Sequence, residues 1–113
     1  MKRFMLITSI VLSTVSIKSH AALYKNCSSS KDKSGYIKSI SVGVDNGEDA
    51  NVSITLQINS TDTTPISVYR KINDENGKAM FDLLLSSYTK ENSITITRCV
   101  DDQIAGVTST IRY

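Results

Sequence analysis

The chain of 113 residues has no tryptophan, one proline, two cysteines and one histidine, His20, which lies near its start. That start differs from the remainder: Lys2 and Arg3 precede an apolar run over residues 4–15, and Ser19-His20-Ala21 follows it. This order of charged, apolar and small residues is typical of a secretory signal, so we expect cleavage after Ala21 and secretion, through the periplasm if the source is bacterial. The apolar run is too short to span a bilayer, so we expect no membrane insertion.

Residues 22–113 contain no excess of basic over acidic residues. Three of the 13 Lys and Arg residues and none of the 11 Asp and Glu residues lie in residues 1–21, so the net charge changes from +2 to −1 over residues 22–113. A chain without surplus positive charge is a poor nucleic-acid partner. Without histidine it also lacks a Ser-His-Asp or Cys-His catalytic group and an imidazole metal site. We expect one non-catalytic domain of 92 residues with no cofactor and no metal.

The two cysteines, Cys27 and Cys99, lie near opposite ends of residues 22–113. Secretion exposes them to an oxidising compartment, and no CxxC spacing or histidine favours reactive thiols instead. We therefore expect a Cys27–Cys99 disulfide, for which loop entropy predicts a stabilisation of roughly 4 kcal/mol.

Polar and apolar residues alternate in five segments, which predicts five strands. The segments are residues 36–44, 52–59, 65–71, 93–99 and 104–113. In the second segment Val52, Ile54 and Leu56 alternate with polar residues, a pattern typical of an antiparallel sheet with one buried face. The turn before it, Asp45-Asn46-Gly47-Glu48-Asp49, contains an Asn-Gly pair that favours a tight hairpin.

One segment, residues 78–89, has a helical pattern, and Asp74 or Asn76 is available to cap it. At about 100° per residue its polar side chains occupy one narrow arc, and apolar side chains cover most of the remainder. A helix on one small sheet needs a narrower apolar stripe. Packing against neighbouring copies explains the surplus better than a deep groove within one copy, because so small a core has difficulty surrounding a helix. The expected interface residues are Met80, Phe81, Leu84, Leu85 and Tyr88.

Five antiparallel strands with a helix between the third and the fourth follow the order of the OB-fold, a five-stranded barrel. The sequence therefore predicts a mainly β domain of this class over residues 22–113. Tyr69 lies on a polar strand face and is a candidate platform for stacking on a sugar.

The chain resembles the B subunits of pentameric bacterial AB toxins, of the Shiga and cholera types. The resemblance lies in a cysteine shortly after the expected signal and in the helical segment Phe81-Asp82-Leu83-Leu84-Leu85-Ser86-Ser87. An alternating Ile and Thr strand that ends at the second cysteine, and a short last strand, complete it.

This resemblance implies a homopentameric ring that binds host-cell glycans through many weak sites and carries a catalytic A subunit. By position, the glycan-binding candidates are Asp45, Asn46, Gly47, Glu48 and Asp49. The main alternative is a small secreted or periplasmic OB-fold protein that binds another protein and has no toxin role. A hydrolase would need carboxylates held in register at this acidic turn, which a hairpin tip does poorly.

Overall fold

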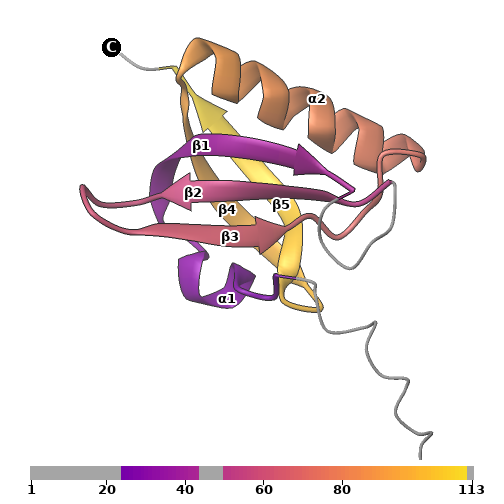
Figure 1. Cartoon of the computed structure of the whole chain (residues 1–113), viewed down its shortest axis with the longest axis horizontal. Helices are drawn as coiled ribbons and strands as arrows, with labels where there is room; N and C mark the ends of the chain where they lie inside the picture. Colours follow the sequence, from indigo (N-terminus) through magenta and orange to yellow (C-terminus); the bar gives the residue numbers. More distant parts are fainter. Residues whose placement is uncertain (1–23, 44–49, 112–113) are drawn as a thin grey trace, which may run out of the picture.

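Five antiparallel strands form the body of the protein in a computed structural model that describes residues 24–43 and 50–111 (Figure 1). In chain order the elements are α1 (Cys27–Ser30), β1 (Ser34–Val42), β2 (Val52–Gln57), β3 (Thr63–Ser67), α2 (Glu75–Lys90), β4 (Ser93–Val100) and β5 (Gln103–Thr110). The expected mainly β class and the expected helix between the third and fourth strands are both confirmed. The short helix α1 has no counterpart among the expected elements.

The strands pair in the order β3-β2-β1-β4-β5, so β3 and β5 lie at the two edges of the sheet. These edges meet at one point, where Val68 and Ile104 form a parallel bridge and the Tyr69 N–H donates to the Ile104 carbonyl oxygen at 2.9 Å. Among the described residues no longer ladder joins the two edges, and the sheet is not closed. We call this meeting point the seam.

The hydrophobic core lies on the inner face of the strands, between them and the buried side of α2. Its buried members come from every strand and include Leu84 of α2. They are Cys27, Ile37, Val52, Ile54, Leu56, Ile66, Val68, Leu84, Ile94, Ile96 and Ile104. The apolar half of the alternation expected in β2 is confirmed, because Val52, Ile54 and Leu56 are each at most 2 % exposed. The expected polar face is not fully exposed, since Ser53 is also buried.

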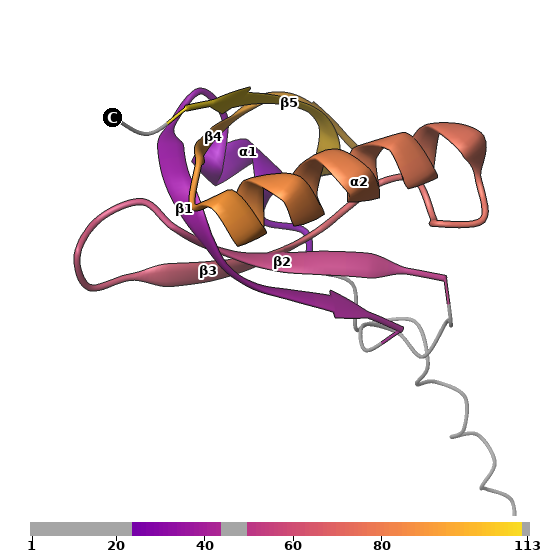
Figure 2. The same cartoon turned by 90° about the horizontal axis from the view of Figure 1, so that it is seen from above.

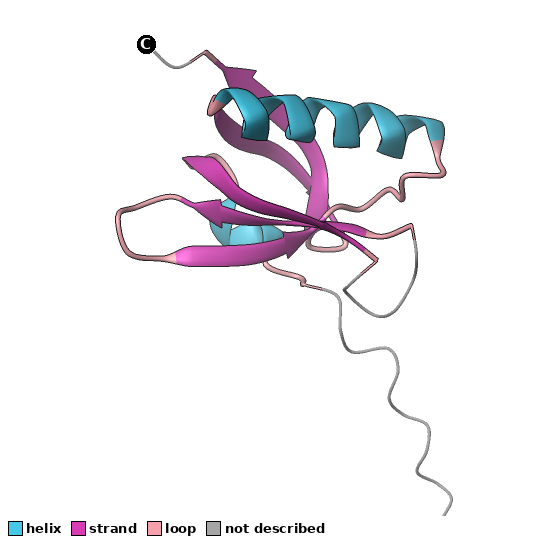
Figure 3. Cartoon of the chain, turned by 45° about the horizontal axis from the view of Figure 1, so that its top comes forward, coloured by secondary structure: helices cyan, strands magenta, loops and turns pink. Residues whose placement is uncertain are grey.

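Helix α2 lies along one end of the strand layer and packs against β1 and β5, whereas α1 lies at the other end (Figures 1, 2 and 3). Of the two expected caps, Asp74 is the one that caps α2. Its side chain accepts a hydrogen bond from the Asn76 N–H. Near the other end, the hydroxyls of Ser87 and Ser109 lie 2.7 Å apart and tie α2 to β5. Glu91 ends the helix in the left-handed conformation.

The expected disulfide between Cys27 and Cys99 is present, and Cys27 is fully buried. It joins α1 to β4 across 72 positions of sequence. The Asp102 carboxylate accepts the Ser28 N–H at 2.7 Å, so the turn between β4 and β5 holds α1 as well. A buried disulfide of this kind indicates an oxidising environment, extracellular or periplasmic.

Candidate functional site

The two larger of the grooves found in the described part of the surface carry exposed aromatic and charged side chains. The first lies at the seam and has a volume of about 510 Å³. We call it the seam groove, and its lining residues are Val68, Tyr69, Arg70, Asn76, Met80, Arg98, Val100, Ile104 and Ala105. Its floor includes Val68 and Ile104, the two residues that bridge the sheet edges.

Tyr69 and Arg70 form one wall of the seam groove, directly after β3. Tyr69 is 40 % exposed although its backbone N–H is used at the seam, so its ring remains available to a ligand. The Arg70 guanidinium carbon lies 5.6 Å from the centre of that ring, within cation–π range. Arg70 Nη1 also donates to Asp74 Oδ2 at 3.0 Å, which fixes the side chain beside the start of α2.

Arg98 lines the seam groove from β4, and irregular strand pairing determines the direction of its side chain. The register of β4 and β5 shifts on both sides of the pair Arg98–Gly106, and such bulges re-aim side chains. Plain alternation would place Arg98 on the buried face with Ile94 and Ile96, whereas the shifts leave it exposed. Its Nη2 donates only to the Ala105 carbonyl oxygen, at 3.4 Å, among the described residues.

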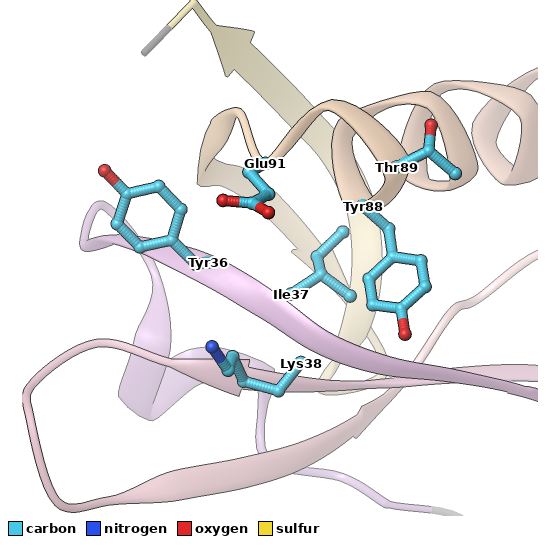
Figure 4. A pocket seen from close by; sticks show the side chains of 6 residues that line it. All are labelled: Tyr36, Ile37, Lys38, Tyr88, Thr89 and Glu91. Carbon is cyan, nitrogen blue, oxygen red and sulfur yellow. The ribbon is translucent and has the colours of Figure 1, made fainter. Parts of the chain in front are cut away.

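The second groove lies between β1 and the end of α2 and has a volume of about 630 Å³ (Figure 4). We call it the helix groove, and its lining residues are Tyr36, Ile37, Lys38, Tyr88, Thr89 and Glu91. In Figure 4 the Tyr88 side chain extends from α2 toward β1 and lies near Ile37. A register shift between Ile37 and Ser39 makes Lys38 the extra residue of a bulge.

Of the expected sugar-binding residues, Tyr69 is the one that falls within the described residues. Tyr69 lies in the seam groove, as an aromatic platform requires. The acidic turn Asp45, Asn46, Gly47, Glu48 and Asp49 falls in residues 44–49, outside the described residues. The arginines of the seam groove were not among the expected site residues. The signal that points to Arg98 is its position in the alternation: a charged side chain follows Ile94 and Ile96 at a place where the pattern calls for an apolar one.

The expected interface residues of the helix divide into two groups. Leu84 is 0 % exposed, and Met80 and Phe81 pack against the core, so these three face their own sheet. Leu85 and Tyr88 are 40 % and 41 % exposed, so within the set these two leave much of their surface uncovered. Leu83, which the expected set omitted, is 37 % exposed.

Titratable groups in the described residues give little indication of catalytic chemistry. Hydrogen bonds from Ser28 to Asp102 lower the pKa of that carboxyl below its ordinary value, which is the effect of its position at the start of α1. Within the described residues no three His, Cys, Asp or Glu side chains gather as metal ligands. Nor does this part of the chain contain a helix both long and apolar enough to cross a membrane.

No family model, curated protein or solved structure matches the chain.

Proposed function

We propose that this protein is a secreted, non-catalytic, glycan-binding B subunit of an AB-type toxin and that it assembles as a ring of identical copies. The proposal includes an OB-fold for residues 22–113 and a signal peptide over residues 1–21. It also includes a catalytic A subunit that docks on the ring. The buried Cys27–Cys99 disulfide supports secretion, because such bonds persist in oxidising compartments.

The strand order supports the OB-fold. Joining β3 to β5 would close the observed order into a five-stranded barrel, and the Val68–Ile104 bridge lies where that closure is needed. The helix between β3 and β4 is a further feature of the expected order.

The apolar surface left on α2 is the observation that carries the proposal. Leu83, Leu85 and Tyr88 are between 37 % and 41 % exposed, so the helix has more apolar surface than its own sheet covers. Aromatic and aliphatic side chains of this size are favoured at the buried centre of protein interfaces. We therefore expect other copies of the chain to cover them.

The arrangement of these side chains favours a ring over a twofold dimer. At about 100° per residue, Leu85 and Tyr88 lie on one flank of the buried side, and Leu83 lies about 160° from Leu85 on the other flank. The outer stripe between the flanks contains exposed polar residues such as Asp82 and Thr89. A helix with one apolar flank toward each of two neighbours fits a head-to-tail interface, which closes into a ring.

The seam groove supports glycan binding, because Tyr69 offers an exposed ring beside polar donors. Sugars bind weakly to single sites of this kind, and a ring multiplies them into firm attachment to a cell surface. The turn residues Asp45, Asn46, Gly47, Glu48 and Asp49, three of which are acidic, remain part of the proposed glycan-binding region.

Binding to surfaces that display glycans at different densities tests this function. We expect the wild-type protein to bind dense glycan surfaces far more tightly than sparse ones, because several sites of one ring engage together. Leu85→Glu should remove that dependence on density, since it places a charge in the copy-to-copy contact. Asp82→Asn, a change on the polar outer stripe, is the matched control.

A protein that binds no glycan at any density, but captures another protein as a monomer, would support the non-toxin alternative instead. Density dependence that survives in Leu85→Glu would show that the exposed flank does not hold copies together.

A further inference from the structure

We propose that the seam groove binds the acidic group of an anionic saccharide, with Arg98 as its principal partner and Arg70 as the second. This inference rests on the proposed glycan-binding function and specifies the class of sugar. The acidic group is a carboxylate or a sulfate, since both present planar or trigonal arrays of anionic oxygens that arginine recognises.

The charge of the seam groove favours an anion. Its lining residues include two arginines and no Asp or Glu, and although Asp74 beside the groove pairs with Arg70, Arg98 has no carboxylate partner among the described residues. Arg98 has only the Ala105 carbonyl oxygen as a partner among the described residues, so most of its five N–H donors remain available. Arg70 is hydrogen-bonded to Asp74 through one nitrogen, which orients the side chain while leaving further donors on its guanidinium.

The remaining walls of the groove suit the uncharged part of a sugar. Tyr69 is 40 % exposed as a residue, and sugar rings stack their C–H faces on aromatic rings such as this one, on the face that Arg70 does not cover. Val68, Ile104 and Met80 give an apolar floor and side, and Asn76 adds an amide that can donate and accept. A volume of about 510 Å³ lies within the range of small-molecule sites.

The backbone around Arg98 holds this arrangement before any ligand arrives. A Cβ on Gly106 would lie 3.0 Å from the Arg98 Cβ, so glycine is the residue that leaves room for the pair. The next pair, Cys99 and Ile104, is anchored by the disulfide and by the seam hydrogen bond from Tyr69. These contacts fix the backbone at Arg98, so the direction in which its side chain leaves β4 is set before a ligand binds.

The helix groove provides a contrast within the same molecule. It has two tyrosines and a larger volume, but Lys38 and Glu91 give it one charge of each sign. An anion therefore gains less there than beside Arg98 and Arg70. Lys38→Gln is accordingly the matched control, because it removes one exposed cation from a groove of similar composition.

The test measures the affinity of monovalent oligosaccharides for the oxidised protein in solution. Calorimetry or NMR titration gives the affinity. The probes share a lactose core. Lactose itself carries no acidic group, 3′-sialyllactose carries a carboxylate and 3′-sulfolactose carries a sulfate. We expect at least one acidic probe to bind about tenfold or more tightly than lactose, since charge-assisted hydrogen bonds contribute this much.

Arg98→Gln should lower that affinity by about tenfold or more, Arg98→Lys should lower it less, and Lys38→Gln should leave it unchanged. The melting temperature of each variant checks that it is folded. The proposal is overturned if lactose binds as tightly as both acidic probes, if none of the three binds, or if folded Arg98→Gln binds like the wild type.

Monovalent probes make the result independent of assembly. A ring that binds only neutral glycans would overturn this inference and keep the proposed function. A monomer that binds an acidic probe through Arg98 would keep the inference and remove the ring.

Discussion

At the scale of single residues, Asp102 has a structural role that depends on pH. Its carboxylate accepts the Ser28 N–H, and this hydrogen bond lowers the pKa of Asp102 below its ordinary value. A carboxyl whose pKa is lower in the folded state stabilises the fold above its unfolded pKa, and this contribution is lost as the pH falls through the folded pKa.

We therefore expect Asp102→Asn to be less stable than the wild type at pH 7 and the difference to shrink below pH 3.8. Urea unfolding at pH 7 and at about pH 2.5 measures the change. Asp82→Asn, an exposed helix carboxylate, should show no such dependence. An equal stability loss at both pH values for Asp102→Asn would contradict the account.

Residue-level features also mark the limit of what the sequence predicts. Alternation correctly places Ile94 and Ile96 in the core, but extended by two positions it would bury Arg98. The same happens in β1, where alternation from Ile40 would turn Lys38 inward, and a bulge leaves it exposed. Burying an unpaired cation costs more than losing a ladder hydrogen bond, so the bulges form where alternation and charge conflict. Both grooves depend on these bulges.

At the scale of elements, the close approach of Gly77 to Lys71 holds the start of α2 against the connection that follows β3. A Cβ built on Gly77 would collide with the backbone carbonyl oxygen of Lys71, so the first turn of the helix packs directly on that strand connection. This contact also brings Asn76 beside Tyr69 and Arg70 in the seam groove.

Gly77→Ala should destabilise the protein by about 1–3 kcal/mol, because the helix start must move away from Lys71. Intrinsic propensity alone predicts the opposite sign, since alanine is favoured over glycine in a helix by about 1 kcal/mol. Chemical unfolding measures the difference, and Lys78→Ala on the exposed side is the control. A gain in stability for Gly77→Ala would show that the contact is absent.

The two leucines Leu84 and Leu85 should respond differently to truncation. Leu84 is fully buried in its own copy, so Leu84→Ala should cost about 2–5 kcal/mol at every protein concentration. Leu85 is 40 % exposed, so Leu85→Ala should lower stability mainly where copies are assembled, which makes its effect depend on concentration. Thermal unfolding over a dilution series separates the two. A concentration-independent loss of the same size for both would contradict the outward position of Leu85.

The expected elements are present, but the structure moves some of their boundaries. The helix expected over residues 78–89 begins earlier, at Glu75, because Asp74 is its cap. The third strand was expected over residues 65–71 but ends at Ser67, because the chain crosses to β5 at Val68 and then turns into α2. Helix α1 depends on the disulfide and on Asp102, long-range partners that its serine-rich sequence does not indicate.

At the scale of the whole molecule, the Cys27–Cys99 disulfide joins the first described element to the last hairpin. Closing a loop of this length stabilises the fold by roughly 4 kcal/mol on the entropy estimate. This is a large fraction of the stability of a small domain.

The double variant Cys27→Ser and Cys99→Ser should therefore unfold at a much lower urea concentration than the wild type, or fail to fold at 37 °C. Reduction of the wild type should reproduce the effect, whereas reduction of the variant should change nothing. A reduced wild type as stable as the oxidised form would show that the bond adds little to the core.

The central claim is that copies of the chain cover the exposed flanks of α2. The mass of the oxidised protein in solution tests this directly. Sedimentation equilibrium of residues 22–113 distinguishes one copy, at about 10 kDa, from a ring of five, at about 50 kDa. We predict an assembly of several copies that Leu85→Glu dissociates and Asp82→Asn does not. A single copy at high concentration, with Leu83, Leu85 and Tyr88 still exposed, would contradict the central claim.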